Sequence, residues 1–333
     1  MAVLDLGGAF TPVESLIGGI LLGICVYYLA AYNGKVTGIS GIVSSFINLD
    51  EDYVWRGIFL IGMIGTGAVA FWTGLVQFEN FKDGEKWGHY ALAGVLVGFG
   101  TKMGMGCTSG HMLCGLSRLS VRSLVATMSF FSTAVLVASY FERGNDLPTS
   151  VRIPSATEAL PLFAVPVAFI VAFETLRLLH SRNALPAHLA FLVTALLGGI
   201  AFSLGLILSG MVLQSKVLGF LDPFKHWDPS LLMVVVGGLL PNVVLYRATI
   251  CKMTAPLFAN KFAIPRKTEI EWKLMAGGVL FGLGWGYLGL CPGPALVNLP
   301  RFTPPVLFFA GAMIVGMRLF VGYSWLVKKL KRE

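Results

Sequence analysis

The chain has 333 residues, of which 56% are apolar and 13% are charged, and its mean hydropathy is +0.76. A soluble domain normally carries about 25% charged residues, so this chain has too few to cover a surface that faces water. Its formal net charge of +8 does not indicate a nucleic-acid partner, because the lysines and arginines gather at the ends of apolar segments. The composition predicts an all-α integral membrane protein surrounded by lipid.

Apolar segments of about 20 residues, the length that crosses a bilayer, recur along the whole chain. The joints between them are brief apart from 141–159 and 248–272, and none is long enough for a soluble domain. The third and eighth segments look short or interrupted. We therefore expect a single membrane transport domain over residues 1–333 with about nine spans, at roughly 14–32, 54–76, 89–106, 121–140, 160–180, 187–209, 230–247, 273–290 and 304–327.

The second half of the chain repeats features of the first in the same order. The matched stretches are 18–20 with 198–200, 35–38 with 216–219, and 94–107 with 278–291. These matches indicate a duplication, with repeat 1 at about 14–141, a connector helix at about 160–180, and repeat 2 at about 187–327. One extra crossing between the units turns the second upside down, so we expect two inverted repeats with a transport site between them.

The basic residues also predict the orientation. On the nine-span scheme most lysines and arginines, including the tail 328–332, lie on the side that holds the C-terminus. The positive-inside rule then places the C-terminus in the cytoplasm and the N-terminus outside. The first ten residues carry an acid and no base, which is not typical of a signal peptide. We expect a multi-pass protein of the plasma membrane, which is the inner membrane if the cell is bacterial.

Glycine and proline interrupt the chain at two matching places at membrane depth. The first is GMGCTSGHMLCGLSRLS, 104–120, and its duplicate is GLCPGPALVNLP, 289–300. Irregular backbone at this depth is tolerated only where it is buried in protein or lines a cavity. Paired breaks in two repeats point to the transport site. A second pair of breaks is expected at NGKVTGISG, 33–41, and QSKVLGFLDP, 214–223, which gives four re-entrant segments.

The chemistry of the first break favours an anion. A loop that restarts a helix presents free backbone donors and the positive end of the helix dipole. Aspartate and glutamate are absent from 88–141 and from 272–332, where a cation pathway would carry acids. The residues expected to bind the anion in the loop are Thr108, Ser109 and Gly110, and those expected to attract it are Lys102, Arg118 and Arg122.

The cysteines narrow the choice of anion. A buried thiol stays protonated and is a soft, weak donor without a charge that repels an anion. It suits a sulfur-terminated anion such as thiosulfate better than an oxygen-only anion such as sulfate. We expect Cys25, Cys107 and Cys291 to line one path, whereas Cys114 and Cys251 are expected to be structural.

His111 is expected beside this path, making a local hydrogen bond. Cys107, His111 and Cys114 have a spacing that suggests a metal, but structural zinc takes four ligands. The duplicate has Ala295 and Asn298 at the corresponding positions. We therefore expect neither a metal nor a cofactor. No phosphate-binding GxxxxGK[ST] loop is present in the sequence, so this chain is not expected to power transport by its own ATPase activity.

Two stretches carry a resemblance to a known family. GCTSGHMLCGLSRLSVRSLVA, 106–126, and GLGWGYLGLCPGPALV, 282–297, resemble the two signatures of the YeeE/YedE family of membrane proteins. The resemblance implies thiosulfate uptake through an hourglass-shaped bundle of inverted repeats. It also implies three path cysteines, which fall here on Cys25, Cys107 and Cys291. It further implies work beside a small cytoplasmic sulfur carrier of the TusA kind.

Two other functions stay open at this point. One is a membrane sulfurtransferase that holds sulfur as a covalent cysteine persulfide. Such an enzyme needs a thiol whose pKa is lowered by a nearby base, and the sequence places no acid–base pair beside a thiol. Transport rather than catalysis is therefore the leading interpretation. The other is transport of a selenium-containing anion, because some relatives are thought to handle selenium.

Overall fold

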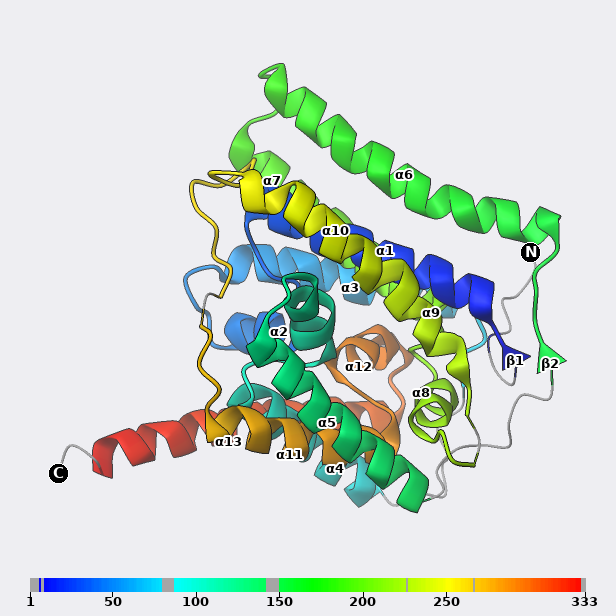
Figure 1. Ribbon diagram of the computed structural model, residues 1–333, viewed down its shortest axis with the longest axis vertical. Coiled ribbons are helices and arrows are strands. Elements are labelled where there is room, and N and C mark those ends of the chain that lie inside the picture. Colours follow the sequence, from blue (N-terminus) through cyan, green and yellow to red (C-terminus); the bar gives the residue numbers. More distant parts are fainter. Residues whose placement is uncertain are drawn as a thin grey trace.

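The structure is a computed structural model that describes residues 6, 9–79, 87–141, 150–225, 227–265 and 267–330. The prediction of an all-α membrane protein is confirmed, because most of the described chain is helical and several of its helices are long and apolar enough to cross a membrane (Figure 1). A pair of two-residue parallel strands, β1 (Ala9–Phe10) and β2 (Ser150–Val151), ties the segment before the first helix to the segment before the connector.

The helical elements fall into two series joined by one long helix. The first series is α1 (Pro12–Asn33), α2 (Ile39–Ile47), α3 (Tyr53–Trp72), α4 (Trp87–Met103), η1 (Ser109–Gly115) and α5 (Val121–Tyr140). The joining helix is α6 (Ala156–Ser181). The second series is α7 (Ala187–Leu208), α8 (Gln214–Leu221), η2 (Pro229–Leu231), α9 (Leu232–Val234), η3 (Val235–Leu239), α10 (Leu240–Ala248), η4 (Ile250–Lys252), α11 (Trp272–Leu288), α12 (Pro292–Asn298), η5 (Leu299–Arg301) and α13 (Pro304–Leu330).

All nine predicted spans fall on helical segments, but the number that qualify as crossings is smaller. Seven segments are long and apolar enough to cross a membrane, and an eighth is formed if α11 and the helical stretch after it, which are bent by 42°, count as one span. Seven or eight of the nine predicted spans therefore meet this length among the described residues. The reason is length, since α4 and α11 have 17 residues each. This agrees with the expectation that the third and eighth segments are short.

The repeated glycines explain how the helices pack. A Cβ on Gly98 of α4 would lie 2.0 Å from the carbonyl oxygen of Met313 in α13. A Cβ on its duplicate Gly282 in α11 would lie 2.5 Å from the carbonyl oxygen of Phe130 in α5. Only a glycine allows these backbones to approach so closely. The two glycines have the same role, and each packs against the last long helix of the other half.

Helices at equivalent positions in the two series pack against each other in opposite directions. Near the start of α1, a Cβ on Gly18 would lie 2.5 Å from the backbone nitrogen of Ser209, just after the end of α7. Further along α1, the Cys25 sulfur lies 3.6 Å from the position of a Cβ on Gly198, in the middle of α7. Helices α4 and α11 cross in the same antiparallel manner. The order of long and short elements is thus repeated, with counterparts paired head to tail.

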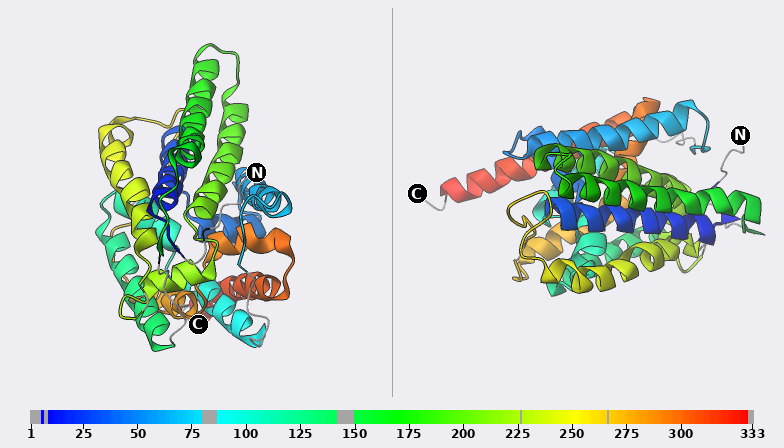
Figure 2. Two further views of the ribbon diagram at one scale, coloured as in Figure 1. Left: turned by 90° about the vertical axis from the view of Figure 1, so that its right-hand side faces the viewer. Right: turned by 90° about the horizontal axis from the view of Figure 1, so that it is seen from above.

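The long axis of α1 runs through the bundle, and α6 lies along its edge (Figures 1 and 2). In the most apolar 18-residue window, 78% of the α1 residues are buried but only 17% of those in α6. Helix α6 also joins the two series in sequence. It is therefore a peripheral connector, whereas α1 forms part of the core.

Four short helical segments, α2, η1, α8 and α12, follow breaks in the chain, and most of their residues are buried. One expected break is displaced. QSKVLGFLDP was expected to open the chain at 214–223, but Gln214–Leu221 is helical, and the turn lies earlier, at 209–213. The reason is Gly210, whose φ of +73° is in the left-handed region that glycine adopts without strain.

Candidate functional site: a thiol cavity and a basic vestibule

The first break is fixed by His111. Helix α4 ends at Met103, and η1 begins at Ser109 as a π-helical turn. The His111 ring packs on Gly106, where a Cβ would lie 2.8 Å from Nε2. Its Nε2 hydrogen-bonds the Gly104 carbonyl oxygen at 3.0 Å, and its Nδ1 hydrogen-bonds Ser123 Oγ at 3.3 Å. The expected local hydrogen bond of His111 is confirmed, and it ties the break to α5.

The second break is held from the other side of the bundle. Gly289, with φ of +67°, ends α11, and Cys291 stands directly before α12. Asn298, fully buried at the end of α12, donates through Nδ2 to the carbonyl oxygens of Val212 and Pro294, at 3.0 Å each. These bonds fasten α12 to the turn that precedes α8. The buried Asn298 side chain therefore fixes the position of α12 after the break.

The two breaks meet at their thiols. The Cys291 sulfur lies 3.8 Å from Thr108 Oγ1, and the Cys107 sulfur lies 3.3 Å from Ser109 Oγ. Both cysteines are buried and line one cavity of about 20 Å³, together with Thr108 and Ser109. A volume of roughly 10–15 Å³ is needed for one water, so this cavity has room for about one. Four of the predicted site residues are thus brought together.

The other lining residues of this thiol cavity were not found from the sequence. They are apolar or contain sulfur, and the lining adds Leu22, Ile39, Met112, Leu113, Phe202, Leu206, Met211, Val234, Gly293 and Pro294. The two methionines place polarizable thioether sulfurs beside the two thiols. Nothing in the sequence distinguishes these methionines from ordinary core residues, because their role depends on which helices meet.

A second, larger cavity lies on the other side of the first break. This vestibule has a volume of about 270 Å³, and its lining includes the predicted residues Gly110 and His111. Its basic lining residues are Lys35, Arg56, Arg118, Arg122 and Lys267. Arg118 and Arg122 had been expected near an anion. Of the others, Lys35 lies in one of the repeated stretches. The sequence predicted the side of the membrane for Arg56 and Lys267 but did not place them in a site.

The wall between the two cavities is thin. Gly38 and Gly110 line the vestibule, whereas their neighbours Ile39 and Ser109 line the thiol cavity. The Ile39 backbone N–H donates to Ser109 Oγ at 3.0 Å. A Cβ on Gly110 would lie 3.7 Å from the Gly38 Cα. Two glycine backbones that face each other therefore separate the basic vestibule from the thiols.

The segment before α11 holds several of the vestibule cations. Arg118 donates to the Pro265 carbonyl oxygen at 2.8 Å, and Arg122 donates to the Glu269 carbonyl oxygen at 3.1 Å. Lys267 donates to Glu271 at 2.5 Å. This hydrogen bond holds the pKa of the Glu271 carboxyl below its ordinary value. The rim of the vestibule is thus cross-linked while its guanidinium groups still line the space.

Two of the predicted residues lie apart from both cavities. Lys102 donates to Ser44 Oγ at 2.6 Å and does not line the vestibule. Cys25 is fully buried, and its thiol donates to the Gly198 carbonyl oxygen at 3.1 Å. Leu22, one turn earlier in α1, is the nearest residue of that helix to line the thiol cavity. All five cysteines are free thiols, and only Cys251 is exposed.

Comparisons with known proteins find a matching family for each half of the chain, as well as relatives. Residues 11–136 match the family described as Sulphur transport, and residues 190–332 match a family of unknown function, DUF6691. A probable transporter of Xylella fastidiosa strain 9a5c is 41% identical over 127 residues, which are 37% of this chain and 84% of that protein. A probable transporter of strain Temecula1 is 37% identical over 125 residues, 38% of this chain and 91% of that protein.

The chain belongs to the sulphur transport family. The resemblance to YeeE/YedE proteins is confirmed by these matches. A thiosulfate transporter, TsuA of Spirochaeta thermophila, is 27% identical over 111 residues, which are 31% of this chain and 33% of that protein. The two family matches lie on either side of α6, so the family boundaries coincide with the two helical series. The chain is therefore a multi-pass membrane protein of a sulphur transport family.

Proposed function

We propose that this protein imports thiosulfate into the cytoplasm through the thiol cavity. The observation that carries the proposal is the meeting of Cys107 and Cys291, from two breaks far apart in sequence, at one buried cavity. The name of the Spirochaeta thermophila relative supports the substrate. The proposal includes the inward direction of transport and the contact of the anion with the cysteine thiols.

The chemistry of the lining favours the sulfur end of the anion. Two thiols and the thioethers of Met112 and Met211 surround the cavity, and these groups are soft and polarizable. The hydroxyls of Thr108 and Ser109 offer harder donors to the oxygen end. An anion with one sulfur end and one oxygen end matches both kinds of partner. Sulfate, which lacks a terminal sulfur, matches only the hydroxyls.

The path is proposed to run between two inverted repeats, over about 14–141 and 187–327. The antiparallel packing of α1 on α7 and of α4 on α11 supports this, because two inverted copies run in opposite directions. The vestibule lies at the α1 end that carries Lys35, on the basic side of the chain. This supports a cytoplasmic C-terminus and an outer N-terminus, although Met1 and 331–333 lie outside the described residues.

Cys25 is proposed to contribute to the same path from behind Leu22, and Lys102 from beside the vestibule. Transfer of the imported sulfur to a small carrier of the TusA kind would take place at the vestibule side. These points rest on the resemblance and on the position of the residues in the bundle.

The deciding experiment is uptake of thiosulfate labelled on both sulfurs into membrane vesicles that contain the protein. We expect both labels to accumulate together, with little competition from excess sulfate. Delivery of only one labelled sulfur would instead support the membrane sulfurtransferase. Stronger competition by a selenium oxyanion than by unlabelled thiosulfate would contradict the assigned substrate.

A further inference from the structure

The duplicated Lys-Val stretch places one lysine at each end of α1. Lys35 follows the last residues of α1, and Lys216 of α8 contacts Thr11, which precedes its first residue. Helix α1 has 22 residues, so these ends are about 33 Å apart at 1.5 Å per residue. The two lysines therefore stand at opposite faces of the bundle.

Each lysine pairs with an acid at the equivalent place in its own half. Lys35 pairs with Asp52, the residue directly before α3. Lys216 pairs with Asp228, the residue directly before η2 and α9, where the second long segment of the second half begins. The lysine–aspartate pair is thus duplicated together with the helices.

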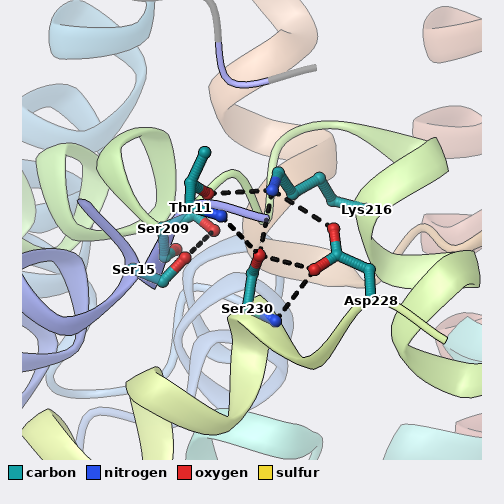
Figure 3. A network of polar contacts seen from close by, with 6 residues as sticks. All are labelled: Thr11, Ser15, Ser209, Lys216, Asp228 and Ser230. Atoms are coloured by element: carbon teal, nitrogen blue, oxygen red, sulfur yellow. Dashed lines mark hydrogen bonds and ion pairs between the residues drawn. The ribbon is translucent and has the colours of Figure 1, made fainter. Parts of the chain in front are cut away.

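The two pairs differ in exposure. The side chains of Lys35 and Asp52 are 15% and 47% exposed, and both residues line the open vestibule. Those of Lys216 and Asp228 are 1% and 6% exposed. Lys216 Nζ donates to Thr11 Oγ1 at 2.8 Å and Ser230 Oγ at 3.0 Å, and lies 3.2 Å from Asp228 Oδ2 (Figure 3). The end of the molecule with Lys35 and Asp52 is therefore open to solvent, whereas the end with Lys216 and Asp228 is closed.

Helix α8 connects the Lys216–Asp228 pair to the segment that carries Cys291. Gln214, at the start of α8, donates through Nε2 to the Leu288 carbonyl oxygen at 2.7 Å. Leu288 ends α11 and stands three residues before Cys291. A Cβ on Gly289 would lie 2.9 Å from the Gln214 carbonyl oxygen, so the backbones are in direct contact. A movement of α8 is therefore transmitted to the segment that carries Cys291.

We propose that Lys216 is the anion-capturing residue of the outer entrance and that Asp228 is its latch. In the closed form the Asp228 carboxylate pairs with the Lys216 ammonium. An incoming anion of the thiosulfate class replaces Asp228 as the partner of Lys216. Helix α8 is then released from Thr11, at the start of α1. A buried ammonium needs a negative partner, which the incoming anion supplies, and the displaced Asp228 carboxylate keeps its hydrogen bonds from the Ser230 N–H and hydroxyl. The assignment of the anion rests on the proposed function, whereas the latch itself does not.

The latch is tested by the accessibility of a buried position beneath it. Ser15 is fully buried one turn into α1, and its hydroxyl donates to the Ser209 carbonyl oxygen at 3.3 Å. In right-side-out vesicles, a Ser15→Cys protein is treated from outside with a membrane-impermeant maleimide, and labelling is corrected for the protein without this substitution. We expect slow labelling that becomes faster by about tenfold or more when Asp228→Asn is added, because removing one partner of a buried pair destabilises the closed form.

The duplicated pair supplies the matched control. Asp52→Asn makes the same charge change at the vestibule end, and it is expected to leave the labelling of Ser15→Cys unchanged. Equal labelling rates with and without Asp228→Asn would overturn the latch. A similar increase from Asp52→Asn would also overturn it, because it would indicate a general loosening of the protein.

A transport measurement separates the latch from the substrate. The double variant Lys216→Met with Asp228→Leu removes both charges, which buried pairs often tolerate without unfolding. We expect it to elute as a folded protein and to take up thiosulfate at least tenfold more slowly at low concentration. Uptake equal to that of the parent would overturn the capturing role of Lys216. If Asp228→Asn speeds labelling but no variant and no parent transports thiosulfate, the latch stands and the proposed substrate fails.

Discussion

The Cys107 thiol contacts the hydroxyl of Ser109 in its own loop. It lines the thiol cavity together with Cys291 from the second half of the chain. Replacing Cys107 with Ala is expected to lower thiosulfate uptake by roughly ten- to a hundredfold, since a lost hydrogen bond to a charged group is worth about 1.5–3 kcal/mol. Cys107→Ser is also expected to transport more slowly than the parent. Serine is the sharper change, because it keeps a donor but replaces a soft sulfur with a hard oxygen. Initial uptake rates in vesicles measure the effect.

Cys114 provides the control for this prediction. It is a buried thiol of the same π-helical turn but does not line the thiol cavity. Cys114→Ser is expected to keep the parent uptake rate. Full activity in both Cys107 variants would show that backbone amides and hydroxyls form the site without the thiol.

A second residue prediction concerns the glycine wall. A Cβ at Gly110 fits at ordinary contact distance, but a longer side chain would fill the space between Gly38 and the thiol cavity. Gly110→Leu is therefore expected to reduce uptake by about tenfold or more while the protein remains folded, because the side chain obstructs the passage between the vestibule and the thiols, and a barrier raised by about 1.4 kcal/mol slows a step tenfold. Gly41→Leu, at an exposed vestibule position with nothing within 4 Å of a Cβ, is expected to transport normally. Matched size-exclusion profiles and uptake rates make the comparison.

The site was partly predictable at this scale. Cys107, Thr108, Ser109 and Cys291 were found because glycine, proline and duplication mark the breaks in the sequence itself. The methionines and Phe202 were not found, because apolar residues that line a small cavity are identical in sequence to those that fill the core. Cys25 was expected on the path from its residue type and from the family resemblance, and its thiol donates to the backbone of α7.

At the scale of elements, helices α4 and α11 are held by glycines that face a partner's backbone. Gly98→Ala and Gly282→Ala each put a methyl group within 2.5 Å of a carbonyl oxygen of α13 or α5. Both are expected to destabilise the protein by about 1–3 kcal/mol, since the packed helices must move apart. Thermal unfolding of the purified protein in detergent measures the loss. Parent-like unfolding temperatures in both variants would contradict this account of the packing.

Gly65 is the matched control within a helix. A Cβ there has no heavy atom within 4 Å, and Gly65 lies inside α3. Gly65→Ala is expected to leave the unfolding temperature unchanged or to raise it, because alanine favours the helix by about 0.5–1 kcal/mol over glycine. The three variants together separate the cost of a lost close approach from the helix propensity of glycine.

Element positions were predicted well, because long apolar runs leave few alternatives in a bilayer. The exact ends of the short helices α4 and α11 were not predicted, because an apolar run does not show where a helix stops and a break begins. The break at 214–223 was displaced for a similar reason. Lysine, valine and leucine around Lys216 continue a helix, and the left-handed Gly210 before them carries the turn.

At the scale of the whole molecule, the chain consists of two series that meet along α1 with α7 and α4 with α11. The exposed joint after α6, at 182–184, is therefore expected to tolerate a cut. Fragments 1–183 and 184–333 produced together are expected to copurify and to keep most of the uptake, because their shared surface is a packed helix interface. Affinity purification through a tag on one fragment, followed by uptake in vesicles, checks this. Either fragment produced alone serves as the control and is expected to be inactive.

The small volume between Cys107 and Cys291 has an electrical consequence for the cell. A cavity with room for about one water holds no continuous file of water between the two faces of the membrane. Protons and small ions then have no standing route through it, and the membrane potential is kept while an anion is carried. The potential is worth about 2.3 kcal/mol per elementary charge per 100 mV, so the proposed import of a dianion into a negative interior works against this force. The protein therefore moves charge in discrete events, and its turnover should slow as the interior of the cell becomes more negative.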